Sequence, residues 1–405
     1  MPLLKHDLTE PDFWARDDCH ALLAAMRREA PVQRHHSASE GPLWAVLSYR
    51  HAAEVLADPA TYSSRGGSLL GTGPDGPPAG TDRMMALSDP PRHRRYRDPA
   101  LPLLSNRRAA ALSGRVRELT GRVVRRALER GEIDFVRDIG AAVPLTVMCD
   151  LMGVAEADRD AIVRLCDQAF LAPDAERRRA AHQRLLPYLF REALARRDHP
   201  GDDLIGALSA PQPDGTRLSV EETVLNCDNI IVGGIQTVRH TAAMSMLALL
   251  RHPGHLRTML DGDADPRRAT EELLRWTSVG LHVLRTARRD TELGGCRVRE
   301  GDRVVVWVPP ANRDEAEFTA PGVLRLDRHP NRHLAFGWGP HYCIGAPLAR
   351  LELTALFEAL AEHVGAIEQT AEPVHNRSII NFGLESLRVT LRPARRPAGP
   401  AAALR

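Results

Sequence analysis

The most constraining feature of the chain is one long segment, roughly residues 220–251, whose middle is apolar around most of the helical circumference. Ser219 and Glu222 have the spacing of a capping box at its start, and Pro253 with Gly254 closes it. A helix that is apolar on most faces must be buried on most faces. The segment therefore predicts a large helical protein in which one helix runs through the core.

The rest of the pattern predicts a mainly α fold with a small β lobe. Apolar residues at helical spacing indicate further helices at 107–131, 139–153, 156–171, 176–196 and 267–276. Strand patterns come late, at 282–287 and 303–308, with glycine-containing turns between them. This order lacks the alternation of strands and helices that builds a doubly wound sheet.

We interpret residues 1–405 as a single domain with an N-terminal arm at 1–20. The tail at 393–405 is rich in Pro, Ala and Arg and is expected to be disordered. Two Gly- and Pro-rich stretches, 65–80 and 198–216, are interpreted as loops, either mobile lids or surface connections.

Composition excludes several classes of function. The formal net charge is +2 and only 4% of residues are aromatic, which gives no case for nucleic acid binding. The six cysteines are scattered without a C-x-x-C pair, which argues against a zinc site and a disulfide framework and favours the reducing cytoplasm. The N-terminus is polar within a few residues and no apolar run is long enough to span a membrane, so we expect no membrane association.

The most informative segment for chemistry is a glycine-punctuated loop, 336–346, that leads into a predicted helix at about 346–363. Gly337, Gly339 and Gly345 let the backbone adopt unusual shapes and approach a flat ligand closely. Cys343 lies just before the helix N-terminus, where free N–H groups and the helix dipole favour a thiolate. A lone cysteine here could also be inert and buried, which is the interpretation for the other five.

The pattern Phe336-x-x-Gly339-x-x-x-Cys343-x-Gly345 resembles the cysteine-loop signature of cytochromes P450. The resemblance implies one roughly triangular, mainly helical domain that holds heme b (iron protoporphyrin IX), with Cys343 as the axial ligand of the iron. It also implies that Phe336, Gly337, Gly339 and Gly345 surround the cofactor. A thiolate ligand favours cleavage of the O–O bond at heme iron.

Further matches follow in the family's order. Glu272-Leu-Leu-Arg275 resembles the E-x-x-R helix, which in the family forms a buried ionic network with a later arginine, here Arg328. Glu and Arg three residues apart share a helix face, and outside this context a surface ion pair would be the ordinary interpretation. The implied role of the three residues is structural support for heme incorporation.

A third match concerns the heme propionates. His93 and Arg97, after Asp89-Pro90-Pro91, resemble the family's H-x-x-x-R element and can meet one propionate together. Arg offers forked donors that suit carboxylates. By the same resemblance, Arg285 and His341 supply the other propionate contacts. For any one of these residues taken alone, a solvated basic face would be the favoured interpretation.

The long helix carries Gly233-Gly234-Ile-Gln236-Thr237 midway. Two glycines inside a helix cost about 1 kcal/mol each relative to alanine, so they need a reason, either close approach to the heme or tight helix packing. Thr237 matches the threonine that steers protons in the family, but Gln236 occupies the position of the usual acid. An amide cannot relay a proton as a carboxylate does. Three explanations remain: protons could follow another water chain, the substrate could supply a polar group to the relay, or the oxidation could be atypical. The substitution Gln236→Glu tests whether proton supply limits the reaction.

The resemblance implies a monooxygenase that activates O2 with two externally supplied electrons and oxidises a small organic molecule. The expected setting of this reaction is the biosynthesis of natural products. The electrons would come from a separate ferredoxin and its reductase, which would dock near Cys343 beside Arg-rich helices. Oxidative coupling or ring closure, a peroxide-driven enzyme and a non-catalytic heme-thiolate sensor are the alternatives. Family resemblance places substrate contacts at Met84, Met85, Phe170, Val232, Leu281 and His282, although for His282 a structural role with satisfied hydrogen bonds is favoured.

Overall fold

The computed structural model describes residues 5–71, 78, 80–171 and 175–394. Its helices confirm the mainly α fold class. In chain order they are α1 (Pro11–Trp14), α2 (Cys19–Glu29), α3 (Tyr49–Ala57), α4 (Arg92–Ala100), α5 (Asn106–Arg130), α6 (Ala142–Leu151), α7 (Glu156–Leu171), α8 (Ala175–Asp198), α9 (Leu204–Ser209), α10 (Val220–Leu250), α11 (Pro253–Leu260), α12 (Pro266–Thr277), α13 (Val308–Ala311) and α14 (Ala346–His363).

The strands form one five-stranded sheet in the order β1-β2-β8-β5-β3 and smaller sheets elsewhere. They are β1 (Val32–Ser37), β2 (Gly41–Val46), β3 (Tyr62–Ser63), β4 (Glu132–Asp134), β5 (His282–Ala287), β6 (Thr291–Leu293), β7 (Cys296–Val298), β8 (Arg303–Trp307), β9 (Val364–Gln369), β10 (Val374–His375), β11 (Leu384–Ser386) and β12 (Arg388–Pro393). The β2 and β8 strands pair in parallel, and β5 pairs antiparallel with β8. This sheet is the small β lobe.

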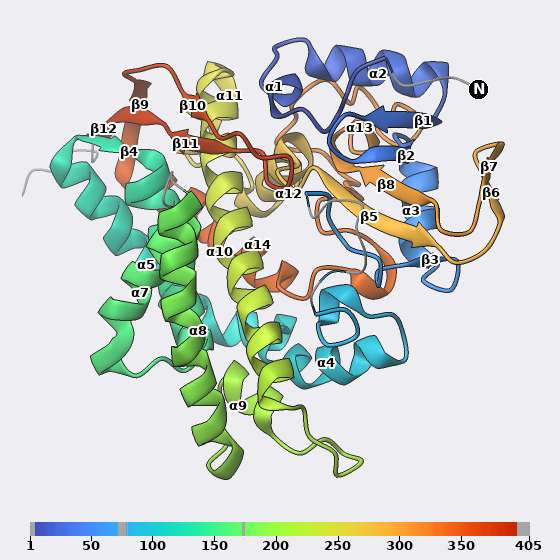
Figure 1. The fold of residues 1–405 in the computed structure, drawn as a ribbon. Coiled ribbons are helices and arrows are strands. Elements are labelled where there is room, and N and C mark those ends of the chain that lie inside the picture. The colour runs from blue at the N-terminus through green and yellow to red at the C-terminus, as the bar shows by residue number, and fades with distance from the viewer. Residues whose placement is uncertain (1–4, 72–77, 79, 172–174, 395–405) are drawn as a thin grey trace, which may run out of the picture.

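Helix α10 runs through the middle of the molecule, with α5, α7 and α8 on one side and the five-stranded sheet on the other (Figure 1). The predicted capping box at Ser219 and Glu222 is present in both directions. Residues along α10 are buried in the two largest apolar clusters, which explains why the helix is apolar on most faces. Helix α14 contacts α5, α10 and α12, so the segment after Cys343 is fixed in the core. Across the described residues, no helix is both long and apolar enough to cross a membrane.

The structure adds detail at the ends and loops. Within the described part of the predicted N-terminal arm, Trp14 is buried and stacks on Trp307 at 5.3 Å between ring centroids. The predicted loop at 198–216 contains the short helix α9, whose start Asp203 caps by accepting from the N–H of Gly206. The predicted tail begins inside β12, and residues 395–405 lie outside the described part of the chain.

Candidate active site

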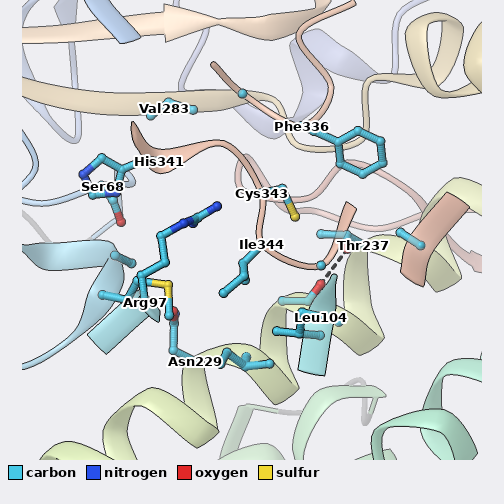
Figure 2. Close-up of a pocket in the computed structure, with 18 of the residues that line it drawn as sticks. Ser68, Arg97, Leu104, Asn229, Thr237, Val283, Phe336, His341, Cys343 and Ile344 are labelled. Atoms are coloured by element: carbon cyan, nitrogen blue, oxygen red, sulfur yellow. Dashed lines mark hydrogen bonds between the residues drawn. The ribbon is translucent and has the colours of Figure 1, made fainter. Parts of the chain in front are cut away.

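A cavity of about 390 Å³ lies between α10 and the loop that leads into α14 (Figure 2). Its wall is mostly apolar and includes residues of α3, α4, α6, α10, β5 and α14. Figure 2 shows Cys343 with Arg97 and His341 on one side of it and Thr237 on the other. Elements distant in sequence therefore contribute the predicted chemistry to one enclosed space.

The loop carries Cys343 into this cavity through a tight turn. Gly337 and Gly339 have φ angles of +71° and +70°, which favour glycine. The backbone N–H of Cys343 donates to the carbonyl oxygen of Phe336 at 2.8 Å, which closes the turn. Phe336, Gly337, Cys343 and Gly345 all line the cavity, as the sequence predicts.

Gly339 has a different role from the one predicted. A Cβ at this position would lie 2.5 Å from the carbonyl oxygen of Leu56 and 2.9 Å from the Cα of Ala57. Gly339 therefore lets the loop pack against the end of α3, and it is not a residue of the cavity wall. The close approach that requires glycine here is between two backbone segments.

The Cys343 sulfur is accessible from the cavity. Burial raises the pKa of the thiol, while the N–H groups of Gly345 and Ala346 and the charges of Arg97 and Arg350 lower it. The protein alone thus disfavours the thiolate, contrary to the expectation from the helix N-terminus. A coordinated metal ion deprotonates a thiol outright, so the thiolate would depend on the iron.

Two arginines and two histidines gather on the cavity wall. Arg97 donates to the carbonyl oxygen of Tyr342 at 2.7 Å, and Arg285 donates to that of its neighbour Leu284 at 2.8 Å. The rings of His93 and His341 lie 4.3 Å apart between centroids. Among the described residues, no carboxylate forms an ion pair with either arginine.

Burial lowers the pKa of Arg285 to about 10, which leaves its guanidinium charged at neutral pH. Burial also lowers the pKa of His93 to about 4 and that of His341 to about 3, with neighbouring arginine charges acting in the same direction. His93 Nε2 has no hydrogen-bond partner among the described residues. Buried cations and unsatisfied donors without a matching anion fit the two propionates of a heme.

The predicted ionic network is present and buried. Arg275 donates twice to the Glu272 carboxylate at 2.8 Å, and Arg328 donates to it at 2.9 Å. Asn331 adds a fourth side-chain hydrogen bond at 3.1 Å. The side chain of Glu272 is fully buried, so the carboxylate depends on these partners for its solvation.

The two glycines of α10 have separate reasons. A Cβ on Gly233 would meet nothing within 4 Å among the described residues, so this position opens onto the cavity. A Cβ on Gly234 would lie 2.7 Å from the Sδ of Met148 on α6. Gly233 thus fits close approach of a cofactor or ligand, whereas Gly234 serves helix packing.

Thr237 lies on the cavity wall, and its hydroxyl donates to the carbonyl oxygen of Gly233 at 2.6 Å (Figure 2). Gln236, at the position of the family's usual acid, is only partly buried and is not part of the wall. The structure therefore does not place Gln236 where a proton relay to the cavity would need it.

The residues predicted to contact substrate differ in whether they line the cavity. Met85 lines the cavity, but Met84, Val232 and Leu281 do not. Leu281 is buried in a core cluster beside the sheet, together with Leu284 and Trp307. The side chain of Phe170 lies outside the described part of the structure.

His282 is also a structural residue. Its Nε2 accepts from the N–H of Leu70 at 2.8 Å and its Nδ1 pairs with the carbonyl oxygen of Ile379 at 3.0 Å. Both ring nitrogens are satisfied away from the cavity, which agrees with the favoured alternative and not with substrate contact.

The sequence interpretation missed several wall residues. Asn229 and Ile230 lie one turn before Gly233 and Gly234 on α10, so helical spacing could have identified them. Glu352 on α14 also lines the cavity, at a seven-residue spacing from Gly345. Nothing in the loop motif itself points to this glutamate.

Comparison with known proteins agrees with the geometry. Residues 267–373 match the cytochrome P450 family model. Cytochrome P450 NovI of Streptomyces niveus is 33% identical over 95% of this chain and 96% of its own length. Linalool 8-monooxygenase of Pseudomonas putida is 30% identical over 96% of this chain and 99% of its own.

The fold has equally similar solved relatives. The crystal structure of P450 OxyD, which is involved in the biosynthesis of vancomycin-type antibiotics, superimposes with a TM-score of 0.89. It is 37% identical and covers 96% of this chain and all of its own. With sequence and structural similarity over nearly its whole length, the chain belongs to the cytochrome P450 family and is a heme-dependent monooxygenase.

Proposed function

We propose that the protein inserts oxygen into a small, largely apolar natural product, using heme b held by Cys343. The observation that supports this most directly is the single cavity wall that combines a thiol, the guanidinium groups of Arg97 and Arg285, the unsatisfied Nε2 of His93 and the Thr237 hydroxyl. The similar protein OxyD, which is involved in the biosynthesis of vancomycin-type antibiotics, favours the same metabolic setting.

Heme with a thiolate ligand would supply the reductive activation of O2. Around it, Cys343 would hold the iron, and Arg97, His93, Arg285 and His341 would bind the propionates. Heme b fits because the chain has no C-x-x-C-H motif for covalent attachment. Gly233 has open space on the cavity side and would let the cofactor or a ligand approach α10 closely.

The remaining wall provides substrate binding. Ser68, Leu69, Met85, Asn229 and Val283 are wall residues that come from a loop, from α10 and from β5. Apolar walls with few polar groups bind a ligand by burial and orient it by hydrogen bonds. Asn229 and Ser68 are therefore our candidates for orienting a polar group on the substrate, and the favoured reaction is hydroxylation.

For electrons we propose a separate ferredoxin with its reductase. Arg94 of α4 and Arg107 of α5 are exposed, α4 also contributes His93 and Arg97 to the cavity wall, and a basic surface attracts an acidic partner. We also propose a cytoplasmic location, since all six cysteines are unpaired thiols.

The test is the reduced carbon-monoxide spectrum of the purified protein. The proposal expects a thiolate-type spectrum that Cys343→Ser abolishes, while Cys296→Ser on the distant strand β7 preserves it. Consumption of reduced nicotinamide with a surrogate ferredoxin system and a substrate found by heme spectral shift then measures turnover. An unaltered spectrum in Cys343→Ser, or oxidation only with added peroxide, would refute the proposal.

A further inference from the structure

A second hollow of about 510 Å³ lies apart from the main cavity, where α2, the end of α12 and the segment after α13 meet. The two share none of their described wall residues. Three arginines, Arg27, Arg28 and Arg313, contribute to the wall of this hollow, and the one carboxylate among the described wall residues belongs to Glu315. We call this hollow the arginine pocket, and the heme chemistry proposed above uses none of its residues.

Arg313 is held firmly in this wall, but its hydrogen bonds are not all satisfied. The residue is 7% exposed, and its Nη2 donates to the carbonyl oxygen of Trp276 at 2.8 Å. Its guanidinium lies over the ring of the same tryptophan, 4.7 Å from the centroid. Its Nη1 is buried without a hydrogen-bond partner among the described residues. An unmade hydrogen bond at a buried charged group is costly, and because Arg313 forms part of the wall, a ligand in the pocket can bring the missing acceptor.

The carboxylates at the pocket are engaged by Arg27. Its guanidinium pairs with Glu315, and its Nε lies 3.7 Å from Oδ1 of Asp314. The Asp314 carboxylate also accepts the first backbone N–H of α3 at 2.8 Å. In the part of the chain that the structure describes, neither Arg28 nor Arg313 forms an ion pair. The pocket wall therefore carries more positive than negative charge.

This positive charge acts on a titratable neighbour. His20 lies on the pocket wall and is accessible to solvent. Desolvation by the surrounding walls and the charges of Arg313 and Arg275 lower the pKa of His20 well below its ordinary value. Burial also lowers the pKa of Arg313 to about 9, which leaves its guanidinium charged at neutral pH. A positive field that disfavours another cation in the pocket favours an anion there.

The rest of the wall indicates what kind of anion fits. Ala21, Ala24, Trp276 and Pro321 contribute apolar surface to the pocket. Arginine presents forked donors that match a planar carboxylate. Small ligands gain affinity by burying an apolar body and gain orientation from a few polar groups. The pocket therefore fits an organic acid that has one carboxylate and a compact apolar body.

We propose that the arginine pocket binds a small organic acid, whose carboxylate contacts Arg313 and Arg28 and whose apolar body lies against Trp276. Arg313 follows Asn312, whose side chain accepts the N–H of Leu334 at 2.7 Å just ahead of the cysteine loop. A ligand that binds only the folded protein stabilises it. Occupation of the pocket therefore raises the unfolding temperature, and this effect requires no turnover at the heme.

The experiment measures binding of para-fluorobenzoate to the heme-loaded protein by fluorine NMR, with the uncharged para-fluorobenzamide as the control ligand. Ala24→Glu places a carboxylate among the arginines of the wall and should weaken benzoate binding by roughly 10- to 100-fold, the equivalent of one charge-assisted hydrogen bond. Ala25→Glu is the matched control, because Ala25 is the exposed neighbour on α2 and is not part of the wall. It should bind benzoate as the wild type does, and the amide should bind at least about tenfold more weakly than the acid.

Two further readouts separate this pocket from the main cavity. Benzoate should raise the unfolding temperature of the wild type and of Ala25→Glu but not of Ala24→Glu, and it should leave the heme absorption spectrum unchanged. Equal binding of acid and amide, or undiminished benzoate binding in Ala24→Glu, overturns the proposal. Binding that shifts the heme spectrum and persists in Ala24→Glu belongs to the main cavity and overturns it as well.

A variant at the exposed Arg28 provides an independent check. Should Ala24→Glu fail to fold, Arg28→Gln decides, because loss of one charged donor should weaken benzoate binding by about tenfold and unchanged binding would contradict the proposal. Absence of the thiolate spectrum in the wild type would refute the proposed function alone, since the arginine pocket shares no described wall residue with the heme cavity.

Discussion

Replacing each glycine of the α10 pair with alanine should change stability in opposite directions. Alanine is favoured over glycine inside a helix by about 1 kcal/mol. At Gly233 nothing among the described residues opposes the added methyl, so Gly233→Ala should raise the free energy of unfolding by about that amount. The same methyl projects into the cavity and should weaken carbon-monoxide binding to the heme.

At Gly234 the methyl would lie 2.7 Å from the Sδ and 3.5 Å from the Cε of Met148. Overpacking of this kind costs about 1–3 kcal/mol. Subtracting the gain in helix propensity, Gly234→Ala should lose between about 0 and 2 kcal/mol. Met148 borders the cavity and can swing into it, which favours the lower half of this range. The two variants should therefore differ by about 1–3 kcal/mol.

Urea titration of the heme-loaded protein measures this difference. Met148→Ala supplies the control, because it removes the atoms that the new methyl meets. In that background Gly234→Ala should become as stabilising as Gly233→Ala, which a double-mutant cycle reports directly. If the two single variants have equal stability, or if Met148→Ala leaves their difference intact, the separation of roles between the glycines is wrong.

Two further predictions concern buried polar groups. Glu272→Gln leaves two buried guanidinium groups without a counter-charge and should lower the free energy of unfolding by about 3–5 kcal/mol, measured by urea titration. His282 accepts a hydrogen bond in its neutral form, and burial lowers its pKa to about 4. The contribution of His282 to the free energy of unfolding is complete above pH 6.5. It should decline by about 3 kcal/mol as the pH falls from 6.5 to 4, because in this range only the unfolded state takes up the proton. His282→Gln should remove this part of the pH dependence, and an unchanged slope would contradict it.

The sequence predicts the site well where a motif joins chemistry to local structure. The cysteine loop, the Glu272–Arg275 pair and the capping box depend on residues close in the chain, and the structure places them as expected. Sequence reasoning fails where a side chain's surroundings depend on distant segments. Gly234 meets a methionine of α6, Gly339 meets the end of α3, and His282 meets Leu70. None of these neighbours follows from local spacing.

The position of Arg285 explains why a mainly helical protein needs its β lobe. Strand β5 lies between β8 and β3, and this holds the Arg285 backbone rigidly while its side chain is buried at the cavity. A buried guanidinium without a carboxylate partner is unfavourable, and its lowered pKa reflects that cost. An anionic group would offset this cost only if it bound next to the Arg285 guanidinium, whose position the sheet fixes. One side of the cavity thus carries a buried positive charge that favours an anionic group at a fixed position. We infer that this preference orients the cofactor relative to Cys343 and Thr237.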